Sequence, residues 1–202
     1  TSGAINAATI NTLTGAAAAA NTAYASNATA QMSGLNDEAV TLDDTTLAVA
    51  TLNTLDGNTS GAINAATINT LTGAAAALNT AYTSNGTDQM SGLNDEAVTL
   101  TDTTLAVALL NTLNGNTSGS VNAGTLTTLS GTAADLNTAY GAAGITGLGN
   151  EAATVSDTTL AVATLNTLDG NTIGTVNAAT INTLTGSAAA ANTAYASGGI
   201  TN

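Results

Sequence analysis

The chain contains no lysine, arginine, histidine, cysteine, tryptophan, phenylalanine or proline among its 202 residues. It carries 13 acidic residues, so its formal net charge at pH 7 is −13. Without a basic side chain there is no counterion-releasing surface for nucleic acid, and anionic lipid surfaces repel the chain. The lack of cysteine excludes disulfides and thiolate metal sites. No apolar run reaches the roughly 18 residues of a membrane span. We therefore expect neither nucleic-acid binding nor membrane insertion.

The same absences argue against catalysis. General acid-base and nucleophilic catalysis draw on His, Lys, Cys or paired carboxylates in a cleft, and only the carboxylates are available in this chain. A glycosidase needs two carboxylates in unlike surroundings on either side of a bond. Here each acidic position recurs along the chain, so each acid is expected in the same surroundings several times over. We expect the protein not to be an enzyme.

What the chain does contain is one block repeated three and a half times. The phrase that begins at Ile10 as Ile-Asn-Thr-Leu-Thr-Gly returns at Ile68, Leu126 and Ile181, which lie 58, 58 and 55 residues further along. The predicted units are 1–58, 59–116, 117–171 and the partial unit 172–202. Self-similarity at a fixed period of this size is typical of solenoids, in which each unit buries its apolar face against the next. We therefore expect one continuous solenoid. Residues 1–31 and 172–202 share one phase and lack a divergent capping unit, so we also expect the chain to be cut from a longer array.

Each block divides again into two related halves. A Leu-Asn-Thr core occurs in one half at Leu136–Thr138 and in the other at Leu165–Thr167, and Gly-containing turns follow both. The elementary coil then has roughly 28 residues, near the upper range for strand-plus-helix solenoids. The chain is expected to form about seven such coils.

Two kinds of helix and intervening strands are predicted. The spacing of leucines predicts helices at Thr45–Leu55, Thr103–Leu113 and Thr158–Leu168, with Asp44, Asp102 and Asp157 as N-caps and Gly57, Gly115 and Gly170 at the C′ position. Alanine-rich helices are predicted at Ala16–Ala25, Ala74–Thr83, Thr132–Gly141 and Ser187–Ala196, with tyrosines that stack by repeat symmetry. Ala39–Leu42 and Val176–Leu184 are β-compatible. The pattern favours an α/β fold, a parallel strand-helix solenoid; an all-β solenoid is the alternative.

Recurring acidic residues are the candidate metal site. Stacked coils would bring carboxylates into a ladder, and with no basic residue in the chain Ca²⁺ would relieve their repulsion. The candidate ligands are Asp37, Glu38, Asp43, Asp44, Asp95, Glu96, Asp102, Glu151 and Asp157. Their spacing matches neither the EF-hand loop nor the calcium-binding nonapeptide. The alternative is that Asp44, Asp102 and Asp157 cap helices while the other acids keep the surface hydrated.

Threonine rows define a second functional hypothesis. Thr9, Thr12 and Thr14 recur in the second block and again in the fourth, at Thr180, Thr183 and Thr185. A regular hydroxyl row would match a periodic ligand such as ice or a polysaccharide. Threonine is also a good strand and turn residue without any ligand. Interspersed residues such as Asn11 interrupt the rows, so a flat threonine face does not follow from the sequence.

Several phrases resemble a known class of repeat. Residues Gly131–Asn137, Ile145–Ala152 and Thr164–Gly170 resemble units in the repeat arrays of very large secreted or surface proteins of bacteria, including marine cyanobacteria. The resemblance spans essentially the whole chain but rests on low-complexity phrases. It implies an extracellular structural role, as an adhesin stalk, a surface layer or a filament, and it carries over no ligand-binding residues.

These lines converge on a structural protein of the cell exterior or cell surface. Nearest-neighbour stacking makes a rod whose length follows the number of repeats, and open apolar ends favour continuation. The expected partner is therefore the protein itself, by end-to-end or lateral association, with glycans as the alternative partner. The absence of Lys and Arg also removes every trypsin cleavage site.

Overall fold

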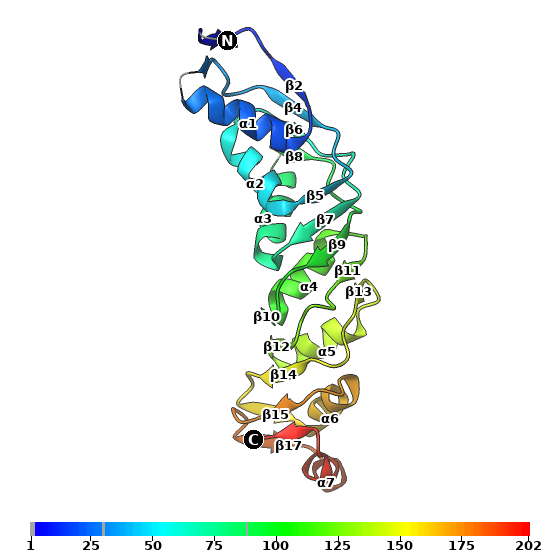
Figure 1. Cartoon of the computed structure of the whole chain (residues 1–202). Coiled ribbons are helices and arrows are strands. Elements are labelled where there is room, and N and C mark those ends of the chain that lie inside the picture. The colour runs from blue at the N-terminus through cyan, green and yellow to red at the C-terminus, as the bar shows by residue number, and fades with distance from the viewer. Residues whose placement is uncertain (1–2, 30, 88) are drawn as a thin grey trace. The chain divides into compact units, whose positions relative to one another are not determined.

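The computed structural model describes residues 3–29, 31–87 and 89–202, and within these ranges it contains seven helices and eighteen short strands (Figure 1). The first two residues of the first predicted repeat lie outside the described residues. The helices are α1 (Ala17–Ala28), α2 (Val49–Asn58), α3 (Ala75–Asn85), α4 (Val107–Asn116), α5 (Ala133–Gly141), α6 (Val162–Asn171) and α7 (Ala188–Ala196). The strands are β1 (Ile5–Asn6), β2 (Thr12–Gly15), β3 (Met32–Ser33), β4 (Ala39–Leu42), β5 (Thr46–Ala48), β6 (Ile63–Asn64), β7 (Thr70–Gly73), β8 (Met90–Ser91), β9 (Ala97–Leu100), β10 (Thr104–Ala106), β11 (Val121–Asn122), β12 (Thr128–Gly131), β13 (Ile145–Thr146), β14 (Ala152–Val155), β15 (Thr159–Ala161), β16 (Val176–Asn177), β17 (Thr183–Thr185) and β18 (Ile200–Thr201).

The fold is α/β, a parallel strand-helix solenoid of about seven coils, as the repeat pattern predicts. The seven helices contradict the all-β alternative. Successive helices begin 32, 26, 32, 26, 29 and 26 residues apart. The coils therefore alternate between two lengths instead of sharing the predicted length of about 28 residues.

The two lengths correspond to two coil types, named here by their helices. Tyr coils carry α1, α3, α5 and α7, each with a tyrosine near its end; Leu coils carry α2, α4 and α6, each built on two buried leucines. Leu52 and Leu55 of α2 are completely buried, and full burial stabilises each by about 1.5–3 kcal/mol. Because the types alternate, tyrosines of successive Tyr coils do not stack on each other as the repeat symmetry suggested. Helix α2 packs between α1 and α3, and helix α6 packs between α5 and α7.

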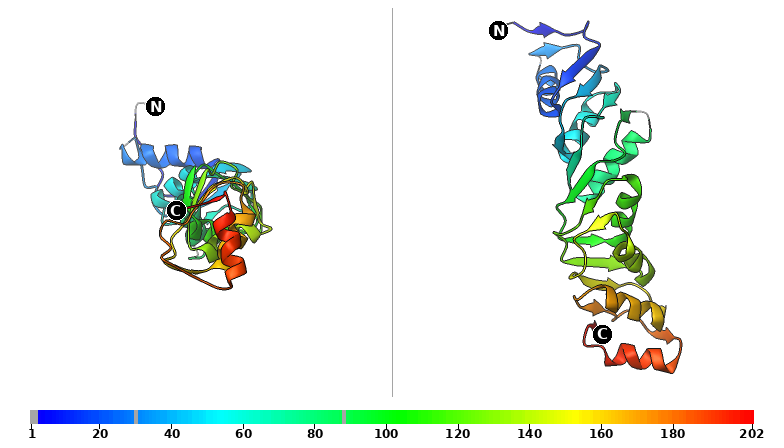
Figure 2. Two further views of the ribbon diagram at one scale, coloured as in Figure 1. Left: turned by 90° about the horizontal axis from the view of Figure 1, so that it is seen from below. Right: turned by 90° about the vertical axis from the view of Figure 1, so that its right-hand side faces the viewer.

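The chain divides into two compact units, each described here by itself. Unit 1 comprises 1–99 with 116–119, and unit 2 comprises 100–115 with 120–202. In unit 1, α1 packs on α2 and α2 on α3; in unit 2, α5 packs on α6 and α6 on α7 (Figures 1 and 2). Within each unit these helices therefore lie beside their neighbours along the chain, as nearest-neighbour stacking requires.

Parallel sheets join the coils within each unit. In unit 1, β2, β4, β6 and β8 pair in that order, and in unit 2, β10, β12, β14, β16 and β18 do so. Residues in register form apolar columns that face the core: Leu13, Val40, Ile63 and Met90 in unit 1, and Leu105, Leu129, Ala153, Val176 and Ile200 in unit 2. The neighbouring column in unit 1, which includes Thr14 and Thr41, is polar. Alternation along strands of two to four residues is thus sufficient to separate core from surface.

The predicted start and end of the Leu helices are wrong. Thr46–Ala48 is strand β5, which pairs with Thr70–Thr72 of β7, and the helix begins only at Val49. Ala48 is the N-cap residue, Gly57 lies inside the helix and Thr59 follows it as the C-cap. The spacing of Leu47 fitted a helix, but its burial comes from strand pairing with the next coil. Asp44 is therefore not the N-cap of α2, and the same frame recurs before β10 and β15.

The Tyr helices and the strand at Ala39–Leu42 agree with prediction to within three residues at each end. Within Val176–Leu184, by contrast, only the two ends form strands, as parts of β16 and β17.

Gly73 shows how closely the coils approach one another. It is the last residue of β7 and has φ of +152°, and a Cβ atom there would lie 2.5 Å from Cγ1 of Val49 in the preceding coil. Only glycine adopts this backbone angle without strain and leaves room for the valine.

Candidate functional site

Three of the predicted metal ligands are buried glutamates that face a tyrosine. Glu38 and Glu96 are 1% and 0% exposed, and Glu151 is 1% exposed. The Tyr24 hydroxyl donates to Oε2 of Glu38 at 3.1 Å, and the Tyr82 hydroxyl donates to Oε2 of Glu96 at 3.0 Å. In the third repeat the hydroxyl of Tyr140 lies 3.4 Å from Oε2 of Glu151. Each tyrosine belongs to a Tyr coil and each glutamate to the Leu coil that follows it.

Backbone amides complete the surroundings of these carboxylates. The amide N–H of Asn36 donates to both oxygens of Glu38, at 3.1 and 2.8 Å, and that of Asn94 donates to Oε1 of Glu96 at 3.0 Å. A carboxylate removed from water is stable only when donors satisfy its oxygens. The chain has no cation for this purpose, so phenol and amide groups provide the donors.

The buried glutamates change the acidity of the tyrosines. Burial raises the pKa of the Tyr82 phenol above its ordinary value, and the nearby Glu96 carboxylate raises it further. Burial likewise raises the pKa of Tyr140 to about 12, with Glu151 adding to the effect. The pKa of Tyr24 is also raised, first by burial. Because ionising the phenol would place a negative charge in a buried site beside an acidic side chain, the tyrosine keeps its proton and remains a hydrogen-bond donor.

Two of the predicted N-cap aspartates do cap helices, but in the preceding coil. Oδ2 of Asp44 accepts a hydrogen bond of 2.7 Å from the amide of Ala17, the first residue of α1. Oδ2 of Asp157 accepts one of 2.7 Å from Ala133, the first residue of α5. A carboxylate at a helix N-terminus satisfies a free amide and complements the helix dipole. The prediction of capping is correct in kind and wrong in the helix it names.

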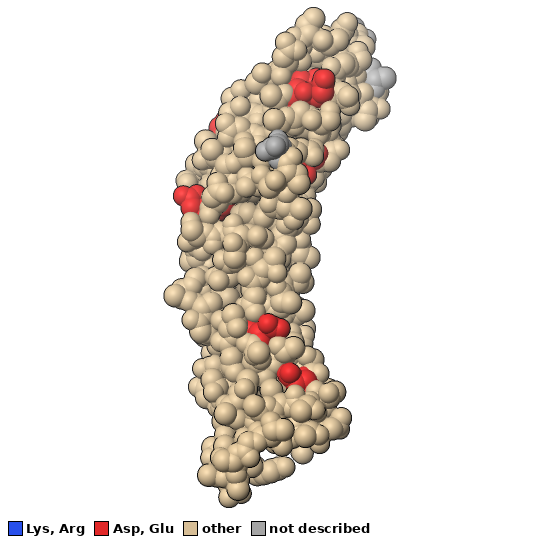
Figure 3. Space-filling view, turned by 180° about the vertical axis from the view of Figure 1, so that it is seen from behind, with Lys and Arg blue, Asp and Glu red and all other residues tan. Residues whose placement is uncertain are grey.

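The remaining candidate ligands lie elsewhere. Asp37, Asp43 and Asp95 are exposed, and Asp102 occupies the position before β10 that Asp44 occupies before β5. In the part of the chain that the structure describes, no three Asp or Glu side chains come together as a group able to hold a metal ion. Acidic side chains form separate small patches on the faces of the two units seen in Figure 3. Calcium binding by these residues stays a prediction.

An asparagine in each of five helices, α1, α2, α4, α5 and α6, forms a contact that the sequence did not lead us to expect. Asn21 of α1 donates from Nδ2 to the carbonyl oxygen of Thr51 in α2 at 3.0 Å, and Asn53 of α2 donates to that of Ala77 in α3 at 2.9 Å. In unit 2 the same bond runs from Asn111, Asn137 and Asn166 to the following helix. We call this series the asparagine ladder. The recurring Leu-Asn-Thr core was its signal in the sequence, because an invariant amide beside buried leucines needs a partner.

Threonine hydroxyls also join the coils. Buried Thr59 donates to the carbonyl oxygen of Glu38 at 3.1 Å and accepts from the amide of Gly61 at 2.9 Å. Thr67 and Thr180, members of the predicted rows, each donate to two carbonyl oxygens of the preceding coil at 2.7–3.0 Å. These hydroxyls are donors to protein carbonyls, so they do not form an unbound row.

Pockets mark the two terminal coils. One, lined by Leu13, Ala16, Ala20 and Val40 among others, lies beside α1, and a larger one of about 220 Å³ lies beside α7. No carboxylate lines either pocket. Among the described residues, none of the helices combines the length and apolar character needed to cross a bilayer.

Compared with protein-family models, with curated proteins and with solved structures, the chain shows no significant match. Its function therefore has to be argued from the contacts described above. Those contacts have one property in common: the recurring polar side chains bind the neighbouring coil.

Proposed function

We propose that the protein is a structural repeat protein of the cell exterior, forming a rod or filament in an adhesin stalk, a surface layer or an extracellular fibre. The observation that carries this proposal is the use of the recurring polar groups. The buried glutamates, their tyrosines, the capping aspartates and the asparagine ladder all bind an adjacent coil. Side chains that bind a ligand or substrate would instead converge on a shared cavity.

The even distribution of stabilising contacts over the coils also favours a structural role. Each coil contributes the same few hydrogen bonds and buried leucines to its neighbour, so stability is expected to add coil by coil. Lengthening such an array adds interfaces without requiring a new core. The absence of trypsin sites and the acidic surface suit exposure outside the cell. The proposal includes no catalytic activity, and its partner is a further stretch of the same repeat.

Arrays of increasing length test the proposal. Chains that contain two, four and eight tandem copies of residues 59–116 would be imaged by negative-stain electron microscopy and measured by small-angle X-ray scattering. We expect the longest dimension to grow in proportion to the number of copies while the cross-section stays constant. Compact particles whose cross-section grows with copy number would contradict a rod. Antibody labelling of intact cells of the source organism tests the location; label seen only after lysis would contradict it.

A further inference from the structure

In the Tyr coils of α1 and α5, one face is covered by the Leu coil that follows. The equivalent face of the α7 coil is open. Residues 177–197 differ from residues 6–26 at one position only, Ser187 in place of Ala16. The surroundings nevertheless differ. Tyr195 is 79% exposed, whereas Tyr24 is 5% exposed. The same sequence is therefore buried in one place and open in another.

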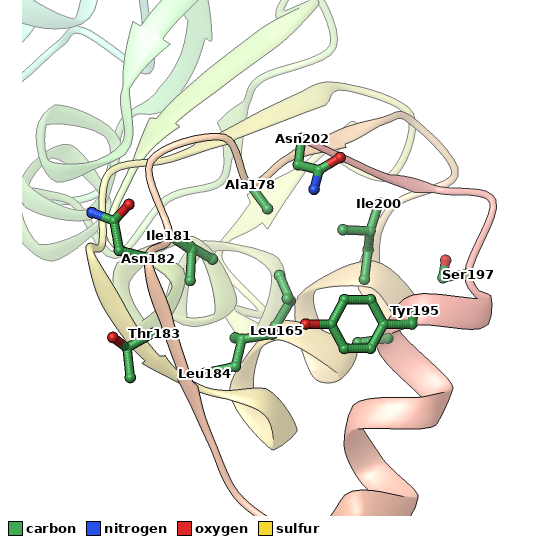
Figure 4. Close-up of a pocket in the computed structure, with 11 residues that line it drawn as sticks. Leu165, Ala178, Ile181, Asn182, Thr183, Leu184, Tyr195, Ser197, Ile200 and Asn202 are labelled. Atoms are coloured by element: carbon green, nitrogen blue, oxygen red, sulfur yellow. The ribbon is translucent and has the colours of Figure 1, made fainter.

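Side chains on this face are those that the interior coils keep in the core. Leu184 is partly exposed, while its counterpart Leu129 is fully buried. Leu165, Ile181, Leu184, Tyr195 and Ile200 line the pocket of about 220 Å³ beside α7 (Figure 4). Figure 2 (left) looks onto this end, with α7 along one side of the last coil.

The backbone of this coil is open at the same place. Strand β17 pairs with β15 and, among the described residues, with no other strand. Its counterparts β2 and β12 each pair on their second edge with a strand of the next Leu coil, β4 and β14 respectively. An edge strand with an apolar face is a template for one more parallel strand.

From these observations we propose that the open face of the α7 coil, formed by β17 and α7, is a docking site for a Leu coil with the sequence of residues 147–171. The inference rests on the proposed structural function and states which unit continues the stack. It is argued from continuity, because the α5 coil binds this Leu coil and the α1 coil binds the equivalent Leu coil of residues 34–58.

The occupant would bring the contacts that both interior copies show. The amides of Ala152 and Ser156 in the covering Leu coil donate to the carbonyls of Thr127 and Gly131 in the α5 coil, both at 2.9 Å. The corresponding carbonyls in the last coil belong to Asn182 and Gly186. Asp157 caps α5 at Ala133, and the matching amide in α7 is that of Ala188.

Two side-chain contacts complete the set. Asn137 donates to the carbonyl of Thr164 in the covering Leu coil at 3.1 Å, and the matching residue in α7 is Asn192. Tyr140 faces the buried Glu151 of that coil, and the matching residue is Tyr195. A second Tyr coil would not serve, because its equivalent residues provide neither the glutamate nor the aspartate.

The Tyr coil of α1 has an open face on the side away from β4, and this face also fits a Leu coil. Strand β2 pairs with β4 alone among the described residues, whereas its counterparts β7 and β17 pair with the strand that precedes a Leu helix, β5 and β15 respectively. A Cβ atom on Gly73 would meet Val49, but one on Gly15 would meet no atom within 4 Å. Both terminal faces of this chain are thus fitted to Leu coils and not to each other.

An extended chain tests the docking. Residues 147–171 would be added after Thr201, and hydrogen exchange of the α7 amides would be compared with that of the original chain. The matched control carries residues 172–196, a Tyr-coil segment of equal length, at the same place. We expect the Leu-coil extension to slow exchange in α7 by about tenfold or more, and to lower the solvent accessibility of the Tyr195 ring.

Asn192→Ala provides the second arm. In the extended chain this substitution should make the α7 amides exchange faster again, in part, because it removes the bond to the added coil. In the original chain, where Asn192 is exposed, it should leave α7 exchange no faster. Unchanged α7 exchange in the extended chain, or equal protection by the Tyr-coil control, overturns the proposal. Because the test reads one interface, it can fail while long arrays still form rods, and it can succeed while they do not.

Discussion

The buried glutamate is held differently in the second repeat and in the third. Around Glu96 the two carboxylate oxygens share the donors, with Tyr82 on Oε2 and the amide of Asn94 on Oε1. Around Glu151 both donors, the Tyr140 hydroxyl and the Gly149 amide, bind Oε2, and the buried Oε1 has no hydrogen-bond partner. The same residue pair is therefore fully satisfied in one repeat and partly satisfied in the other.

The loop between tyrosine and glutamate explains the difference. Glu96 lies 14 residues after Tyr82, but Glu151 lies 11 after Tyr140. In the longer loop Asn85 clamps Leu93, donating to its carbonyl at 2.8 Å and accepting from its amide at 3.0 Å. The loss of three residues removes the clamp, yet the strands and helices of the third repeat keep their order. Coil stacking thus tolerates the deletion. Its unfavourable effect falls on the buried Glu151, whose Oε1 atom has no hydrogen-bond partner.

Replacing the glutamates should give the largest contrast. In Glu96→Gln the side-chain NH₂ replaces one carboxylate oxygen, so one of the two donors faces another donor and loses its acceptor. We expect the free energy of unfolding to fall by about 1–3 kcal/mol. Glu151→Gln can keep both donors on its oxygen and place its NH₂ at the unpartnered position, so its loss should be clearly smaller. Urea unfolding of the two variants measures both values, and equal losses would contradict the comparison.

Removing the clamp should make the second repeat resemble the third. Asn85→Ala leaves the amide and carbonyl of Leu93 without their side-chain partners, and we expect a cost of about 1–2 kcal/mol. Hydrogen exchange should quicken at Leu93 and in the adjoining loop. Asn27→Ala is the matched variant, because Asn27 forms the same two bonds to Leu35. If either loop keeps its protection, the clamp does not hold it.

Capping by aspartate should matter more in the first repeat than in the third. The N-cap of α1 is Ala16, which provides no side-chain bond, so Asp44 is its side-chain cap. Helix α5 also has Thr132, whose hydroxyl accepts from the amide of Asp135. We expect Asp44→Ala to cost about 1 kcal/mol and Asp157→Ala nearer 0.5 kcal/mol. The exchange rates of the first-turn amides of α1 and α5 report each effect; a larger loss at α5 would reverse the ranking.

Alkaline pH should destabilise the second repeat more than the third. A tyrosine whose pKa is raised on folding stabilises the protein fully below its unfolded pKa of about 10 and less as pH rises. For Tyr140 this contribution is lost between about pH 10 and the folded pKa of about 12, whereas the pKa of Tyr82 is raised further. The second repeat should therefore lose stability over the wider pH range, and Tyr82→Phe should reduce the alkaline fall in melting temperature more than Tyr140→Phe does. Tyr140→Phe should flatten the pH dependence of α5; an unchanged slope would assign it to another group.

The repeated coil and its helices could be predicted because they depend on local pattern. Alanine-rich segments such as Ala133–Gly141 carry their own helix propensity, and Ala39–Leu42 alternates as a strand must. The strand at Thr46–Ala48 was hidden, because leucine spacing there also fits a helix. Its structure is decided by pairing with Thr70–Thr72, which lie in another coil. Strands of two residues carry no periodicity from which to predict them.

The sequence showed the recurring acids, but it did not show the contacts that the glutamates make. Acids in a chain without cations are expected at the surface, and Asp37 does lie there. Glu38, its neighbour, is buried because Tyr24 and the amide of Asn36 meet it. The recurrence of tyrosine and glutamate at a nearly constant spacing was the available signal. This spacing could be interpreted only once the fold showed that the tyrosine and the glutamate of each pair are in contact.

The asparagine ladder gives each stack a direction. From Asn21 to Thr51, from Asn53 to Ala77 and from Asn137 to Thr164, the side-chain amide donates to the coil that follows, and the carbonyl that accepts belongs to the later helix. For this bond, one face of a coil provides the donor and the other face provides the acceptor. Two stacks meeting by like faces would bring donor to donor or acceptor to acceptor. An assembly built from such coils has a head and a tail, and its two ends can be told apart by any partner that hydrogen-bonds to them.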